Sequence, residues 1–357
     1  MKESGKAYNR VVIKVGSSLF CSEKAGLDRE LLGNIVREVC GLLDAGKEVV
    51  IVSSGAIALG MLKLGFSLRP KELSYLQAAA ATGQSILMQS YFSLFEKHGK
   101  HCSQVLLTWD DFNDRKRYLN AKNTLKALLK LKSVPIINEN DTVSTDEIKF
   151  GDNDQLSARV ASLISADLLI MLSDVDGLLD KDKKIIGVVS KIDNYIRSLA
   201  CPTAKKTCVG GMITKIEAAS IASSSGIPCV IANGKSIGII AQASKDPFAF
   251  GAWTVFVPEK GCLAERKRWI AFGSKAKGTI VIDDGAAVAL KRRKSLLSVG
   301  VVNVIGEFAS GDIALVTNAK GVEICRGKVS VSSHQLNKIK GSRSEKEVIH
   351  CDNIVLV

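Results

Sequence analysis

Short apolar runs alternate with amphipathic helical stretches over about the first 260 residues, and this alternation constrains the fold more than any other feature. The run Leu168–Leu172 is apolar throughout, which is typical of a strand buried on both faces of a parallel sheet. Asp28 can cap a helix whose apolar residues recur at helical spacing. We therefore expect an α/β fold with an open, mainly parallel sheet sandwiched by helices.

Further apolar runs predict the other elements of this sheet. The expected strands are Val11–Val15, Val49–Val52, Val105–Leu107, Val134–Ile137 and Pro228–Ala232. The expected long helices are Leu76–Phe95, Leu119–Leu131 and Leu156–Ile164. Ligands of open α/β sheets bind beyond the carboxyl ends of the strands, so the residues that follow these runs are the candidates for chemistry.

The pattern changes after residues 266–269, where short alternating runs punctuated by glycines predict a small, mainly β barrel or sandwich. We expect a first domain at residues 1–262, a linker at 263–276 and a second domain at 277–357. Residues 266–357 hold 16 Lys+Arg against 8 Asp+Glu, a net +8 of the total +13. A basic domain of this kind could bind nucleic acid or simply present a solvated basic surface.

Several protein classes are disfavoured by what the sequence lacks. The polar first ten residues have no apolar signal-peptide core, and no stretch approaches the ~20 apolar residues of a membrane span. The nine cysteines form no CxxC pair, so we expect reduced thiols, mostly in the core, and a cytoplasmic protein. No P-loop, no protein-kinase HRD or DFG element, and no GxGxxG after the first strand is present.

Two candidate anion-binding features follow the first two strands. Lys14 lies inside the apolar run VVIKV, and a buried ammonium needs an anionic partner such as a phosphate. An edge-strand lysine that faces water is the alternative. The segment Ser53-Ser54-Gly55 joins a strand to a helix, where free backbone N–H groups bind carboxylate or phosphate, or merely receive a helix cap.

An acidic and carboxamide-rich block is the richest feature of the chain. It consists of Asn138-Glu139-Asn140-Asp141 after an apolar strand and Gly151-Asp152-Asn153-Asp154 at the start of a helix. Such a cluster in one cleft needs a cation, either Mg²⁺ or a substrate ammonium, although a single acidic loop residue is usually just solvated.

Two later segments suit nucleotide phosphates. Ser173-Asp174 ends the strand Leu168–Leu172, and Gly210-Gly211-Met212-Ile213-Thr214-Lys215 precedes a helix. Paired glycines let the backbone approach phosphates, and Lys215 on the first helical turn can reach a terminal phosphate. Taken alone, this glycine and lysine spacing is common.

Taken in order, these segments resemble the amino-acid kinase family and, within it, the glutamate 5-kinase group. The matching text is VVIKVGSS, VIVSSGAIALG, LLTWDDFNDRKRYLNAKNTL, INENDTVSTDEIKFGDNDQLSA, LSDVDGL and GGMITKIEAA. The INEND and GDND pair is its most specific part. The tail text GTIVIDDGAAVAL and SLLSVGVVNVIGEF resembles the PUA domain, which is an RNA-binding module in other proteins.

The resemblance implies transfer of the γ-phosphoryl group of ATP to the side-chain carboxylate of L-glutamate, the first step of proline biosynthesis. It implies catalytic roles for Lys14, Lys215 and Asp154, with Asp154 organising Mg²⁺. The implied glutamate-binding residues are Ser54, Asp141 and Asn153. The implied ATP-binding residues are Lys14, Gly16, Ser173, Asp174, Gly210, Gly211, Met212, Thr214 and Lys215. It further implies a dimer or tetramer and a glutamyl-phosphate reductase partner.

The chain departs from the family pattern at Cys208-Val209, where Gly-Thr is usual, and in the tail at Val331 and Cys351. Two other readings stay open at this point. One is a kinase of the same fold with another acceptor, such as aspartate, acetylglutamate or a nucleoside monophosphate. The other is an RNA-binding or regulatory protein with a disused kinase core.

Overall fold

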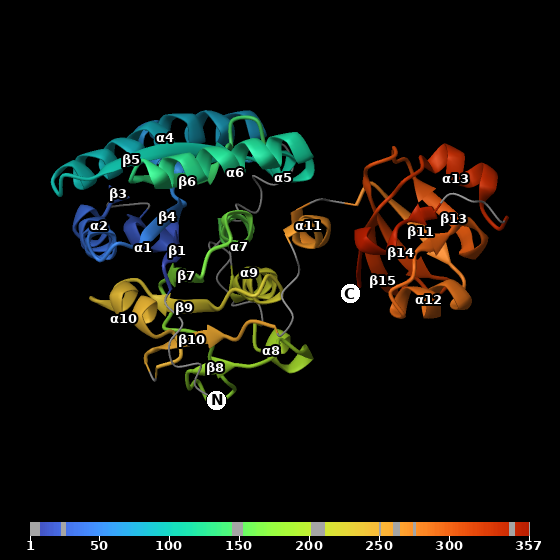
Figure 1. Cartoon of the computed structure of the whole chain (residues 1–357). Helices are drawn as coiled ribbons and strands as arrows, with labels where there is room; N and C mark the ends of the chain where they lie inside the picture. Colours follow the sequence, from blue (N-terminus) through green and yellow to red (C-terminus); the bar gives the residue numbers. More distant parts are fainter. Residues whose placement is uncertain are drawn as a thin grey trace. The chain divides into compact units, whose positions relative to one another are not determined.

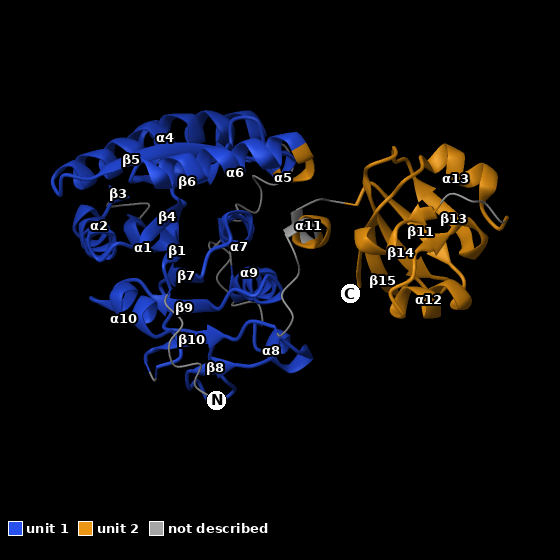
Figure 2. Ribbon diagram, viewed as in Figure 1, with its two compact units in different colours: residues 1–111, 116–262 blue, residues 112–115, 263–357 orange. Residues whose placement is uncertain are grey.

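The computed structural model describes residues 8–22, 26–144, 153–200, 211–249, 251–259, 265–273, 276–342 and 347–356. The chain divides into two compact units (Figure 2). The larger unit comprises residues 1–111 and 116–262, and the smaller unit comprises residues 112–115 and 263–357. Among the described residues, no helix combines the length and the apolar character needed to cross a membrane.

The larger unit is built on one mainly parallel sheet, as predicted. Its strands, in spatial order, are β5 (His101–Leu107), β6 (Ser133–Glu139), β4 (Glu48–Ser53), β1 (Arg10–Val15), β7 (Leu168–Ser173), β9 (Cys229–Asn233), β10 (Trp253–Phe256) and β8 (Val188–Val189). β10 runs antiparallel to β9. The short strands β2 (Cys21–Ser22) and β3 (Gly26–Leu27) form a separate pair.

Helices cover both faces of this sheet, with α2 and α10 on one side and α7 and α9 on the other (Figure 1). The helices are α1 (Ser17–Phe20), α2 (Arg29–Asp44), α3 (Ala56–Lys63), α4 (Leu73–Glu96), α5 (Trp109–Asn113), α6 (Arg115–Lys130), α7 (Asn153–Ile164), α8 (Asn194–Ser198), α9 (Met212–Ser224) and α10 (Ile239–Lys245). The predicted cap of α2 is present, because the Asp28 carboxylate accepts a hydrogen bond from the Leu31 N–H.

The strand order places a topological switch point at the centre of the sheet. β1 pairs in parallel with β4 on one side and with β7 on the other, so that Val15 lies level with Ser53 and Leu172. Ligands of open α/β sheets bind where the order reverses in this way, beyond the carboxyl ends of the strands. The chemistry-bearing residues after β1, β4, β6 and β7 therefore share one edge.

Close contact between α3 and α4 fixes the helix that begins at this edge. A Cβ added at Gly60 of α3 would lie 1.7 Å from the Ala79 carbonyl oxygen, and one at Gly83 of α4 would lie 1.7 Å from the Ala56 carbonyl oxygen. Only glycine allows the two backbones to approach so closely. Helix α4 is thereby held against the residues that follow β4.

The smaller unit is mainly β, as predicted, with a five-stranded sheet in the order β13, β11, β14, β15, β17. Its elements are α11 (Glu265–Arg268), η2 (Trp269–Gly273), β11 (Gly278–Ile282), α12 (Asp284–Lys291), β12 (Leu296–Leu297), η3 (Ser298–Gly300), β13 (Val301–Gly306), β14 (Ile313–Asn318), β15 (Glu323–Lys328), α13 (Ser333–Ile339), β16 (Glu347–Ile349), η4 (Cys351–Asn353) and β17 (Ile354–Leu356). It has an apolar core of its own, around Ile280, Val316 and Leu336. Residues 265–273, which lie in the predicted linker, are helical.

Candidate active site

Two lysines from distant parts of the chain meet at one aspartate. Lys14 lies on β1, Asp154 is the second residue of α7, and Lys215 lies on the first turn of α9. The Lys14 Nζ lies 2.6 Å from Asp154 Oδ1, and the Lys215 Nζ lies 3.3 Å from Asp154 Oδ2. All three side chains are buried. Lys14 is thus on a central strand, and the alternative of a water-facing edge lysine is wrong.

The surroundings of Asp154 favour its charged form. Burial by itself would raise the pKa of this carboxyl group, but the charges of Lys14 and Lys215 and hydrogen bonds from Lys14 and Thr214 outweigh burial and lower the pKa to about 2. The Thr214 hydroxyl donates to Asp154 Oδ2 at 2.8 Å. Two ammonium groups on one carboxylate leave a positive excess in this trio, which favours an additional anion.

Gly16 keeps the space beside the Lys14 ammonium open. A Cβ at this position would lie 3.4 Å from the Lys14 Nζ and 3.3 Å from the Leu172 carbonyl oxygen. The Gly16 N–H already donates to that carbonyl at 3.3 Å. What Gly16 offers a ligand is therefore close approach of the backbone rather than a free donor.

The segment after β4 differs in one respect from the sequence prediction. The expectation of free backbone N–H groups is wrong for Ser54, because its N–H donates to the Val15 carbonyl oxygen at 3.1 Å. This bond continues the β1–β4 pairing for one more residue. The Ser54 hydroxyl accepts a hydrogen bond from the Asn153 amide at 2.9 Å, so Ser54 takes part in the site through its side chain.

A chain of side-chain amides joins α4, β6 and α7 at the same edge. The Asn153 Nδ2 lies 2.9 Å from both the Ser54 Oγ and the Asn138 Oδ1, and the Asn138 Nδ2 donates to the Gln84 Oε1 at 2.8 Å. Asn138 and Asn153 are buried, so these bonds are made in a low-dielectric setting where they fix orientation. Asn138 also accepts from the Glu139 N–H, which leaves its orientation fully determined.

Sequence reasoning missed Gln84 as a member of this chain and left Asn138 without a role of its own. Gln84 lies on α4, far from Asn138 in the sequence, and no periodic pattern links the two. The sequence offered only a local sign of this role, because Gln84 is a polar residue that follows Gly83 within a run of small and apolar residues. A polar residue beside a close helix contact is a candidate for a buried hydrogen bond.

Asp141 lies in the turn after β6 and differs from Asp154 in its surroundings. Burial raises the pKa of Asp141 to about 6, and the charge of Arg69 opposes this rise only in part. Ser54 and Asn153 are joined by a hydrogen bond, whereas no hydrogen bond or ion pair among the described residues joins Asp141 to either of them.

The predicted nucleotide segments lie at the ends of β7 and at the start of α9. Asp174 Oδ1 lies 3.2 Å from the Ser173 Oγ and 3.3 Å from the Ser18 Oγ, so both hydroxyls can donate to it. Gly211 is the N-cap of α9 and Met212 is its first residue. Gly210 and the unusual pair Cys208-Val209 lie outside the described residues.

The donor set around Asp154 bears on the predicted magnesium ion. Both Asp154 oxygens are engaged by lysines, and among the described residues no group of three acidic side chains closes around one point beside it. Mg²⁺ usually takes one or two carboxylates together with substrate phosphates and water. An ion at this point would share Asp154 with the two lysines and would take its other ligands from nucleotide phosphates and water.

Comparison with known proteins adds the family. The sequence model of the amino acid kinase family matches residues 9–233, and that of the PUA domain matches residues 278–351. A glutamate 5-kinase of Caldanaerobacter subterraneus is 44% identical over an alignment that covers 98% of each chain. One of Marinomonas is 44% identical over the whole of both chains, and one of Pseudomonas savastanoi is 45% identical over 98% of this chain and 99% of its own.

Proposed function

The chain belongs to the amino acid kinase family, and from this premise we propose that it phosphorylates the side-chain carboxylate of L-glutamate with ATP. The product is L-glutamyl 5-phosphate, and the reaction is the first step of proline biosynthesis. Full-length similarity to the glutamate 5-kinases supports the choice of glutamate over the other acceptors of the family. Retention of Lys14, Asp154 and Lys215 in one centre argues against a disused kinase core.

The meeting of Lys14 and Lys215 at Asp154 is the observation that carries this proposal. The acceptor is a carboxylate with a reference pKa of about 4.3, already ionised at neutral pH, so no general base is needed. The obstacle is repulsion between this anion and the triphosphate, which for two unit charges ~4 Å apart costs about 4 kcal/mol at an effective dielectric near 20. Two ammonium groups at the transfer point reduce that cost.

The bond changes in the transfer balance without an added proton carrier. An oxygen of the glutamate side-chain carboxylate forms a bond to the γ-phosphorus, and the bond from this phosphorus to the β–γ bridging oxygen breaks. ADP leaves with the electron pair. Lys14 and Lys215 neutralise the charge on the transferring group, and Asp154 holds the two ammonium groups in position.

We assign the remaining roles on the same premise. Glutamate is bound by Ser54, Asn153 and Asp141, of which Asp141 receives the α-ammonium group. ATP is bound by Lys14, Gly16, Ser173, Asp174, Gly210, Gly211, Met212, Thr214 and Lys215. Asp154 helps to hold a divalent ion, for which Mg²⁺ is the proposed identity. When bound, that ion supplies charge neutralisation on the phosphate oxygens.

We propose a cytoplasmic enzyme that forms a dimer or tetramer and passes its labile acyl phosphate to a glutamyl-phosphate reductase. We also propose that the domain at residues 277–357 contacts RNA, while residues 1–262 carry the catalysis. Light scattering on the purified chain tests the assembly, and binding of RNA at several salt concentrations tests the second domain.

Trapping the acyl phosphate tests the proposed reaction. ATP, Mg²⁺, glutamate and hydroxylamine are incubated with the full chain, and the glutamyl hydroxamate and ADP are measured together. We expect both products in equal amounts with glutamate, and neither with aspartate, acetylglutamate or a nucleoside monophosphate. ADP release that is independent of glutamate, or hydroxamate formed from another acceptor, would contradict the proposal.

A further inference from the structure

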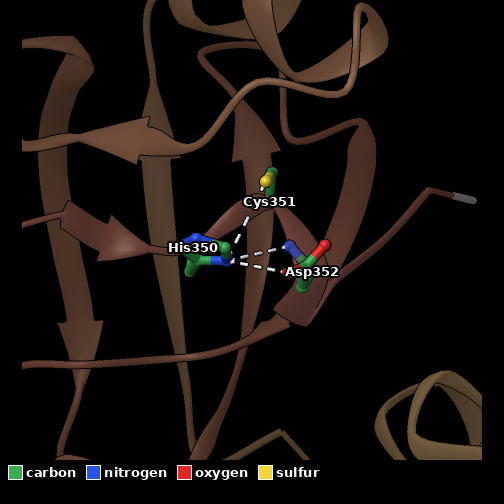
Figure 3. Close-up of side chains that lie close together, drawn as sticks. All are labelled: His350, Cys351 and Asp352. Carbon is green, nitrogen blue, oxygen red and sulfur yellow. Dashed lines mark hydrogen bonds and ion pairs between the residues drawn. The ribbon is translucent and has the colours of Figure 1, made fainter.

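Three side chains of different chemistry converge in the smaller unit, apart from the kinase chemistry. His350, Cys351 and Asp352 follow one another at the turn η4, between the strands β16 and β17. One ligand atom from each, an imidazole nitrogen, a sulfur and a carboxylate oxygen, lies within 4.8 Å of the other two. Figure 3 shows interactions that run from the His350 ring both to Cys351 and to Asp352.

The spacing of these atoms suits a four-coordinate metal ion. The His350 Nδ1 lies 3.8 Å from the Cys351 Sγ and 3.6 Å from the Asp352 Oδ2. A tetrahedral zinc ion, with bonds of about 2.3 Å to sulfur and about 2.0 to 2.2 Å to nitrogen and oxygen, places such ligand atoms roughly 3.4 to 3.6 Å apart. The pairs that involve Nδ1 are thus already close to the required separations.

The hydrogen bonds of His350 select the tautomer that a metal ion requires. The Asp352 N–H donates to the His350 Nδ1 at 3.2 Å, which assigns a lone pair to Nδ1 and the proton to Nε2. The Nε2 faces the Glu347 carboxylate at 3.9 Å. A carboxylate behind the second nitrogen of a ligating histidine is a recurring arrangement in metal sites. A bound ion would take the place of the Asp352 N–H as the partner of Nδ1.

The backbone that carries the three residues is anchored, the His350 and Asp352 side chains are exposed, and Cys351 is partly exposed. The Cys351 N–H donates to the Ser295 hydroxyl at 3.0 Å, and the preceding Ile349 is buried in the core of the unit. The His350 and Asp352 side chains are 48% and 77% exposed. An ion can therefore enter without unfolding of the turn, and water can fill a fourth position.

We propose that His350, Cys351 and Asp352 form a binding site for a divalent transition-metal ion, with Zn²⁺ as the best match. Thiolate and imidazole donors select ions of this class, whereas Mg²⁺ requires hard oxygen ligands. The site is therefore distinct from the Asp154 centre. The bound ion ties the turn η4 together next to the last strand, and its binding free energy adds to the stability of the folded unit.

Titration with Co²⁺ tests the proposal, because a cobalt–thiolate bond gives a charge-transfer absorption and tetrahedral cobalt gives intense visible bands. The full chain is reduced, freed of metal and titrated with Co²⁺ alone. Zn²⁺ is then added in competition, and Mg²⁺ is added in excess in a parallel sample. We expect one equivalent of Co²⁺ with a thiolate band, displacement by Zn²⁺ and no displacement by Mg²⁺.

Variants assign the signal to these residues. In Cys351→Ser the charge-transfer band should disappear, and in His350→Ala the affinity for Co²⁺ should fall by at least about tenfold. Cys21→Ser, a partly exposed thiol in the larger unit, and His334→Ala, an exposed histidine on α13, should bind as the parent chain does. All four variants should keep the glutamate-dependent activity, so the outcome is independent of the proposed function.

Two results would overturn the metal site. One is a parent chain that binds no stoichiometric Co²⁺ or Zn²⁺ under reducing conditions. The other is a thiolate band of unchanged intensity in Cys351→Ser, which would place the ion on other cysteines. Circular dichroism of each variant shows whether the smaller unit remains folded, which we expect because His350 is exposed and Cys351 is partly exposed.

Discussion

Asp154 is buried and Asp141 is half-buried at the same edge of one sheet, and the pKa values of their carboxyl groups move in opposite directions. Burial raises both values. At Asp154 this rise is outweighed by Lys14, Lys215 and hydrogen bonds, and the pKa falls to about 2. At Asp141 only Arg69 opposes burial, and the pKa rises to about 6. Position at the sheet edge therefore does not set the charge, whereas the supply of cationic partners does.

This difference divides the site into two regions with opposite requirements. At Asp154 two ammonium groups lie against one carboxylate, an arrangement that can also receive a phosphate. Asp141 is half-buried with its pKa raised to about 6, and a substrate ammonium beside it would favour its charged form.

The sharpest test of the comparison is the same substitution made at both positions. Asp154→Asn leaves two buried ammonium groups without their carboxylate and should cost about 3 to 5 kcal/mol of unfolding free energy. Asp141→Asn removes a carboxyl group that is ionised only at a cost, so it should raise stability at neutral pH. Urea unfolding of both variants beside the parent chain measures the two effects. Two changes of the same sign would contradict the comparison.

The pH dependence of these two effects should also be opposite. The contribution of Asp154 to the free energy of unfolding is fully present above the unfolded pKa of 3.8 and is lost as pH falls through about 2. The gain from Asp141→Asn should be absent below about pH 4 and should develop as pH rises to about 6, because the folded pKa lies above the unfolded one. Unfolding curves between pH 3 and 7 measure this crossover for Asp141.

Substitution of either lysine tests the role of the Asp154 region in catalysis. Lys14→Ala and Lys215→Ala should each reduce turnover by at least ~10²-fold, the effect of losing one electrostatic donor at a transfer centre. Lys47→Ala is a suitable control, because the Lys47 Nζ donates to the Ser244 carbonyl oxygen, away from Asp154. Unchanged turnover in Lys14→Ala or Lys215→Ala would remove that residue from the mechanism.

Asp141→Ala tests the role of the Asp141 region in the binding of glutamate. Loss of a charged partner for the α-ammonium group should raise the KM for glutamate by about 10-fold to 100-fold and leave the KM for ATP unchanged. In the parent chain the glutamate KM should also rise as pH falls below about 6, because Asp141 is then protonated. This rise should be absent from Asp141→Asn. A shift in the ATP requirement instead would show that glutamate is bound elsewhere.

The fold was largely predictable because most of the parallel strands contain an apolar run. Leu168–Leu172 was predicted and β7 spans Leu168–Ser173. The antiparallel β10 was not predicted, since four residues in the pattern WTVF are too short a signal to distinguish from a loop. In the second domain the alternating runs 279–282, 299–304, 313–317, 323–326 and 353–357 predict strands, and they overlap β11, β13, β14, β15 and β17.

The candidate site was predictable as a set of residues but not as a set of bonds. The positions of Lys14, Asp154 and Lys215 at strand and helix ends follow from the sequence pattern. Their convergence depends on the order β4, β1, β7, which no local pattern encodes. The same applies to Gln84, whose partner Asn138 lies on another element, and to the Ser54 N–H, which is used by the sheet.

Gln84→Ala is the mildest test, because it acts on the site only through Asn138. The change removes the acceptor of the Asn138 Nδ2, so Asn138 and then Asn153 lose their fixed orientation. A lost hydrogen bond of about 1 kcal/mol corresponds to roughly a fivefold rise in the glutamate KM, with turnover and the ATP KM unchanged. Ser85→Ala, an exposed neighbour on α4, is the matched control. The contrary result is that Gln84→Ala lowers turnover, raises the glutamate KM and lowers the free energy of unfolding together. That result would show that Gln84 serves the stability of α4 rather than the position of Asn153.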